Sequence, residues 1–134
     1  MVERRITDPV RIAQLLASEV AGRSEGPLGQ VDVVDADREA TPASGGTLAY
    51  RLAGPEGSLG AVTLYPEAVV LSLDSRHSGL DDAALEAGEA AANGLDRETV
   101  TVSRETDHLS VEIRSGAATR PALDVLRAVV RARS

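Results

Sequence analysis

This chain of 134 residues lacks several residue types that often stabilise a fold or take part in catalysis and metal binding. It contains no cysteine, no phenylalanine and no tryptophan. Without cysteine there are no disulfide bonds, no thiol nucleophiles and no thiolate ligands for structural zinc. The only aromatic residues are Tyr50 and Tyr65, so the core must be built from valine, leucine, isoleucine and alanine.

Lysine is also absent, and all 14 residues of the lysine and arginine class are arginine. This excludes a Walker A phosphate loop and any Schiff-base chemistry, since both need a lysine. The two histidines, His77 and His108, are isolated from each other in the sequence and cannot form a cage of several histidines around a metal. We therefore expect no metal and no cofactor.

Long hydrophobic runs are missing as well. The N-terminal stretch MVERRITDP has no apolar segment of signal-peptide length. No run approaches the roughly 18 apolar residues that a membrane span needs. We expect a soluble, cytoplasmic protein without a membrane partner.

Acidic residues dominate what is present. There are 21 of them against the 14 arginines, which gives a formal net charge of −7. An acidic surface and a core of small aliphatic side chains suit concentrated salt, which strengthens apolar burial and screens self-repulsion. The composition resembles that of small acidic haloarchaeal cytoplasmic proteins. A high-GC genome would also replace lysine by arginine, but it does not explain the acidity. The negative charge argues against a nucleic-acid partner.

Periodicity and capping residues predict three helices and six strands. Asp8 and Pro9 are typical of a helix start, and Gly22 ends that first helix. In the strand TLAYRLA, alternation places Leu48, Tyr50 and Leu52 on one face. The expected helices cover residues 9–21, 79–92 and 119–133, and the expected strands cover 30–36, 47–53, 58–65, 68–74, 98–104 and 108–114.

This order predicts a single α+β domain over residues 1–134, with a mostly antiparallel sheet and helices packed on one face. The order is α-β-β-β-β-α-β-β-α. It resembles the type III secretion chaperone-like fold, α-β-β-β-α-β-β-α, with one additional strand. That resemblance implies a fold, and it raises a chaperone-like or adaptor role only by analogy.

The stretch VDADREATPASGG looks like the start of a calcium loop, because Asp35, Asp37 and Glu39 alternate along it. A calcium loop of this type needs glycine at its sixth position and a bidentate glutamate at its twelfth. Counted from Asp35, those positions hold Ala40 and Gly46. We therefore expect a solvated acidic loop and no metal site.

Two further motifs resemble catalytic sites. The segment 22–26, GRSEG, matches the G-x-S-x-G pattern of hydrolases, but a helix precedes it where that pattern needs a strand. The segment DSRHSG holds triad residue types side by side, and adjacency prevents the geometry of a triad. Its Arg76 and His77 are instead the candidates for an anion-binding or small-molecule site, and the leading hypothesis is non-enzymatic.

The second helix carries a face of small residues: Ala84, Ala87, Gly88 and Ala91. Such a face permits close approach of two backbones, so this helix or an unpaired sheet edge is expected to form the twofold contact of a homodimer. Alternatively, the small face lies flat on the sheet of its own domain. The leading functional hypothesis is a non-enzymatic protein-interaction module that dimerises. The alternative is a small-molecule or anion-binding domain, with or without enzymatic activity, that uses the loop with Arg76 and His77.

The composition generates a first prediction about salt. Molar KCl raises the midpoint of thermal unfolding well above its value in dilute buffer, because salt screens acidic repulsion and strengthens apolar burial. Circular dichroism across a KCl series measures this. A midpoint that does not change with KCl would contradict the saline interpretation.

Overall fold

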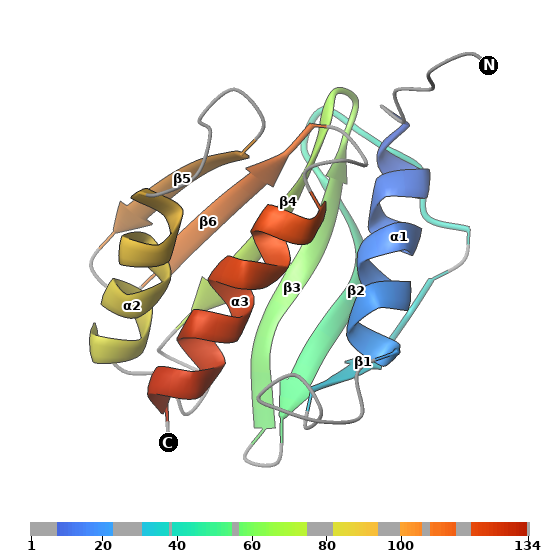
Figure 1. Cartoon of the computed structure of the whole chain (residues 1–134). Helices are drawn as coiled ribbons and strands as arrows, with labels where there is room; N and C mark the ends of the chain where they lie inside the picture. Colours follow the sequence, from blue (N-terminus) through green and yellow to red (C-terminus); the bar gives the residue numbers. More distant parts are fainter. Residues whose placement is uncertain are drawn as a thin grey trace, which may run out of the picture.

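The computed structural model describes residues 8–22, 31–37, 39–54, 57–74, 82–93, 100–105, 108–114 and 119–133. Its elements follow the predicted order (Figure 1). They are α1 (Pro9–Ala21), β1 (Asp32–Val34), β2 (Thr47–Gly54), β3 (Gly57–Tyr65), β4 (Ala68–Asp74), α2 (Asp82–Asn93), β5 (Val100–Glu105), β6 (His108–Ile113) and α3 (Thr119–Arg133). The predicted α+β class is confirmed.

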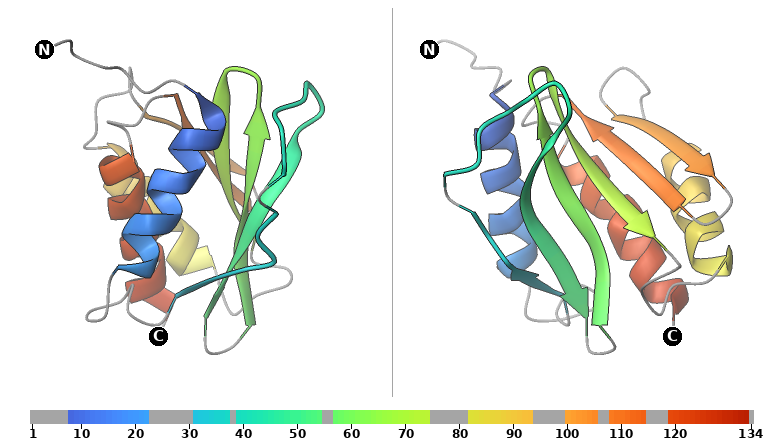
Figure 2. Two further views of the ribbon diagram at one scale, coloured as in Figure 1. Left: turned by 90° about the vertical axis from the view of Figure 1, so that its right-hand side faces the viewer. Right: turned by 180° about the vertical axis from the view of Figure 1, so that it is seen from behind.

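The strands form one antiparallel sheet in the order β1-β2-β3-β4-β6-β5. Seen along its edge, the sheet carries the three helices on one face only (Figure 2, left). α1 contacts β1, β3 and β4, whereas α2 contacts β5 and β6. α3 lies between these two helices and contacts both (Figure 1).

The first helix begins and ends where the sequence predicts. The Asp8 side chain accepts a hydrogen bond of 3.1 Å from the backbone N–H of Val10, and Pro9 occupies the first turn. Gly22 is the C-cap, and its N–H donates to the carbonyl of Ser18 at 2.9 Å. The capping residues thus satisfy backbone groups that the helix itself leaves unpaired.

The core lies between the helices and the sheet and is aliphatic, as expected, apart from Tyr50. Alternation on β6 is regular, with Leu109, Val111 and Ile113 fully buried. The largest fully buried side chains are Ile12, Leu16, Leu52, Leu59, Leu64, Leu71, Leu73, Leu85, Leu109, Ile113 and Leu123.

The alternation predicted for β2 is wrong at one end. Leu48 pairs with Thr63, whereas Tyr50 pairs with Val62, so Ala49 is an extra residue in β2. This β-bulge reverses the side-chain phase. Leu48 is consequently 36% exposed, and Ala49 and Tyr50 are both buried.

The small-residue face of α2 is partly internal. A Cβ atom on Gly88 would lie 2.4 Å from Val129 of α3 and 2.8 Å from Leu109 of β6. Gly88 is therefore the point where α2 packs closely on its own domain, and it is not available for a contact between two copies. Of the two readings of this face, the intramolecular one describes Gly88.

This packing predicts opposite effects for one chemical change at two glycines. Gly88→Ala destabilises the protein by about 1–3 kcal/mol through overpacking, although alanine in an open helical position would stabilise by up to about 1 kcal/mol. Gly45→Ala, in the turn before β2, is the matched control. It is expected to leave stability unchanged or raise it slightly, because nothing lies within 4 Å of a Cβ there.

Urea denaturation of both variants gives the two free energies of unfolding. If Gly88→Ala were as stable as the parent or more stable, the packing of α2 described above would be wrong.

Candidate functional site

The residues that the sequence offered as a ligand-binding loop, Arg76 and His77, lie outside the described residues. The same is true of the G-x-S-x-G segment beyond Gly22. Gly22 itself is a helix C-cap in the right-handed region. His108 is the first residue of β6, and its Nε2 lies 2.6 Å from Ser110 Oγ.

In the acidic stretch after β1, the carboxylates of Asp35 and Asp37 make separate contacts. Asp37 Oδ1 accepts a hydrogen bond of 2.9 Å from the backbone N–H of Glu39, which forms an Asx turn. Asp35 Oδ2 lies 3.8 Å from Nε of Arg51 on β2. Across the described ranges, no three His, Cys, Asp or Glu side chains gather in a group that could hold a metal ion.

A pocket of about 550 Å³ opens between α1 and the connection from β1 to β2. The sequence did not predict it. Its lining is largely apolar and comes from α1, from β1 to β3, and from three residues of the connection, Ala36, Asp37 and Ala40. The lining residues are Val10, Ala13, Gln14, Ala17, Ser18, Val33, Ala36, Asp37, Ala40, Ala49, Tyr50 and Leu64.

Small side chains explain why this space stays open. Five of the lining residues are alanine, contributed by α1, the connection and β2. Ala13 and Tyr50 are buried, whereas Ala36 and Asp37 are exposed. The pocket therefore runs from the surface of the connection down to the edge of the core.

The β-bulge holds the outer wall in place. The backbone N–H of Asp37 donates to the carbonyl of Ala49, the extra residue of β2, at 2.9 Å. Asp35, two residues before Asp37, has φ +53°. This is a left-handed conformation that aspartate tolerates better than most residues. The turn at Asp35 and the hydrogen bond to the bulge together fold the connection back toward α1.

Tyr50 joins the floor of the pocket to α1. Its hydroxyl donates a hydrogen bond of 2.7 Å to the backbone carbonyl of Ala13, and both residues are buried. Burial raises the pKa of Tyr50, because the phenolate would lose its hydration there. Tyr50 is therefore a neutral hydrogen-bond donor that fixes the distance between β2 and α1.

A weak signal for the pocket exists in the sequence. Val10, Ala13, Gln14, Ala17 and Ser18 recur at helical spacing beside the buried stripe of α1, and most of them are small. The partner wall is not visible from the sequence, because it depends on where the chain from 35 to 46 folds.

Comparison with family models finds one that matches residues 1–134. The chain belongs to DUF7993. This is a family of unknown function, so membership assigns no activity to the pocket. Searches of curated proteins and of solved structures find no match. No helix within the described part of this DUF7993 chain is long and apolar enough to cross a membrane.

The buried Tyr50 generates a prediction about alkaline pH. The folded protein holds the phenolic proton more tightly than the unfolded chain, so the stability from this group is fully present below about pH 10 and is lost as pH rises above it. In a Tyr65→Phe variant, Tyr50 is the sole tyrosine. Its phenolate absorbance is expected to appear only together with the loss of helical circular dichroism.

The variant Tyr50→Phe serves as the comparison. It loses the hydrogen bond to Ala13, which costs about 1 kcal/mol of unfolding free energy. If Tyr50 ionised near pH 10 in a chain that stays folded, its placement in the buried floor would be wrong.

Proposed function

We propose that this DUF7993 protein is a non-enzymatic protein-interaction module that acts as a homodimer in a saline cytoplasm, and that β5 forms the twofold contact. The observation that carries the proposal is the position of β5 at the end of the sheet order. An edge strand presents unpaired N–H and C=O groups that can pair with a second chain.

β5 has few of the features that protect sheet edges. It is six residues long, and its register with β6 runs from Val100 to Glu105 without a bulge. It contains no proline, and its two charged residues, Arg104 and Glu105, lie together at its C-terminal end. The opposite edge strand, β1, has only three residues. Short strands, bulges and charged or proline residues are the usual protection of an edge, so β5 is the better template for pairing.

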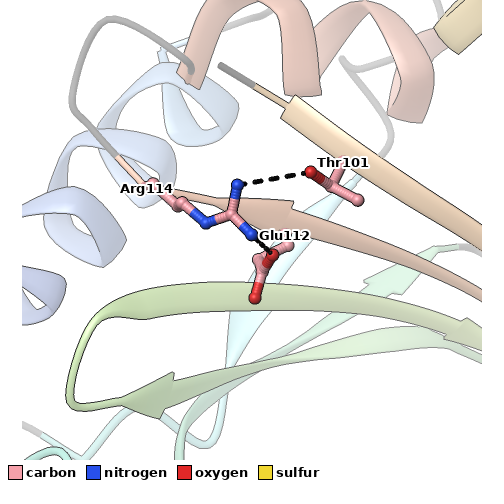
Figure 3. Close-up of polar contacts among 3 residues, drawn as sticks. All are labelled: Thr101, Glu112 and Arg114. Carbon is pink, nitrogen blue, oxygen red and sulfur yellow. Dashed lines mark hydrogen bonds and ion pairs between the residues drawn. The ribbon is translucent and has the colours of Figure 1, made fainter. Parts of the chain in front are cut away.

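Polar contacts hold β5 in an ordered position. Arg114, just after β6, is ion-paired with Glu112 and donates a hydrogen bond of 3.4 Å to the hydroxyl of Thr101 on β5 (Figure 3). Arg104 of β5 lies 3.8 Å from the carboxylate of Glu89 on α2. A strand held both by the residue that follows β6 and by α2 loses little further conformational entropy when a second copy pairs with its outer edge.

Antiparallel pairing of β5 with its copy would make one continuous sheet with the helices of both copies on the same face. This arrangement needs no contact at Gly88. It also links association to salt, because two chains of net charge −7 repel each other until salt screens the charge. A chaperone-like or adaptor role for the dimer rests on the resemblance of element order alone.

Sedimentation in molar KCl tests this function. The parent is expected to have the mass of two copies, with a dissociation constant that falls as KCl rises. Successive residues of a strand point their N–H groups to opposite sides, so only one of Ser103→Pro and Val102→Pro removes a donor from the outer edge. The proline variant that removes an outer N–H is expected to stay folded, because its pairing with β6 is intact. It is expected to weaken the dimer about tenfold or more, because twofold symmetry removes two hydrogen bonds.

The variants Ser103→Ala and Val102→Ala are the matched controls, since they keep the backbone N–H. They are expected to dimerise. A parent with the mass of one copy at every protein and salt concentration would remove the proposal.

A further inference from the structure

We propose that the pocket between α1 and the connection from β1 to β2, lined there by Ala36, Asp37 and Ala40, is a binding site for a small amphipathic molecule with an apolar body and a cationic head, such as an alkylammonium group. The site is independent of the proposed dimer contact. It is built on β1 to β3, at the far end of the sheet from β5 (Figure 2, right).

The apolar body follows from the walls. Val10, Val33 and Leu64 line the pocket with the five alanines, so most of the surface offered to a ligand is aliphatic. The volume of about 550 Å³ is within the range of pockets that enclose small ligands. Burial of an alkyl chain against such walls is favourable because it removes apolar surface from water.

The cationic head follows from charge. Among the described lining residues, Asp37 is the one with a side chain that is charged at neutral pH. Among the arginine side chains that the structure describes, none lines the pocket. The remaining polar groups are the amide of Gln14 and the hydroxyls of Ser18 and Tyr50. A negatively charged head would be repelled by the Asp37 carboxylate.

Asp37 is also held in a position where its carboxylate can accept a hydrogen bond from a ligand. Its backbone N–H is bonded to Ala49 and its Oδ1 accepts the N–H of Glu39. A carboxylate has about four acceptor positions, so one such bond leaves capacity for an ammonium group. The Tyr50 hydroxyl donates its proton to Ala13, which leaves the phenolic oxygen only as an acceptor. Both fixed groups therefore favour a ligand that donates hydrogen bonds.

Three probes of equal chain length separate the two parts of the proposal: n-octylammonium, 1-octanol and octanoate. Each is titrated into the parent and followed by NMR of the alanine methyl groups, at the lowest KCl concentration in which the protein is folded. We expect all three to shift the methyl signals of the pocket. We expect n-octylammonium to bind about fivefold tighter than 1-octanol, as for an exposed ion pair, and octanoate to bind weakest.

Variants locate the binding. Asp37→Asn keeps the acceptor oxygen of the Asx turn and is expected to bring n-octylammonium to the affinity of 1-octanol. Asp35→Asn is the matched control, because Asp35 does not line the pocket, and it is expected to keep the preference. Ala17→Leu and Ala36→Leu fill the space from opposite walls and are expected to weaken all three probes.

Each part of the proposal can fail separately. Equal binding of octanoate and n-octylammonium would overturn the cationic head. Binding that survives both Ala17→Leu and Ala36→Leu would place the probes elsewhere and overturn the site, as would the absence of binding by every probe. The oligomeric state of the protein affects none of these outcomes.

Discussion

The structure depends on burying one face of a single antiparallel sheet under a core cluster that, among the described residues, is aliphatic apart from Tyr50. With no phenylalanine or tryptophan to span a gap, the helices must approach the sheet closely. Gly88 is the clearest sign of this constraint, since it allows α2 to lie against Val129 and Leu109. A core of this kind is held by many small contacts, so each unfilled space has a cost.

The pocket is the place where this close packing stops. Along α1, Ile12 and Leu16 reach the core, while Ala13 and Ala17 on the neighbouring stripe are too short to meet the connection from β1 to β2. The bulge at Ala49 fixes that connection against β2, because the Ala49 carbonyl accepts a hydrogen bond from the backbone N–H of Asp37. Bulges often occur beside functional sites, and here the bulge builds one wall of the candidate site.

The order of the elements could be predicted because it depends on local patterns. The caps at Asp8 and Gly22 and the alternation on β6 are visible in a few neighbouring residues. The bulge could not be predicted, because it depends on which residue of β3 faces each residue of β2. Leu48 was therefore placed on the wrong face.

The proposed functional surfaces are harder to predict for the same reason. The small-residue face of α2 had two possible partners, and only the fold shows Gly88 against α3. The pocket joins residues of α1 to residues near 36–40 and 49–50, which are distant in sequence. The sequence pointed to an unpaired sheet edge as one route to a dimer, but it did not say which strand would form that edge.

The central claim is that β5 pairs with a second copy, and residue-resolved amide hydrogen exchange in molar KCl tests it most directly. A strand paired on both sides has every N–H bonded, whereas an unpaired edge has alternate N–H groups open to water. A paired β5 gives slow exchange at consecutive residues from Thr101 to Arg104. Slow and fast exchange at alternate residues of β5, at a protein concentration high enough for association, would contradict the claim.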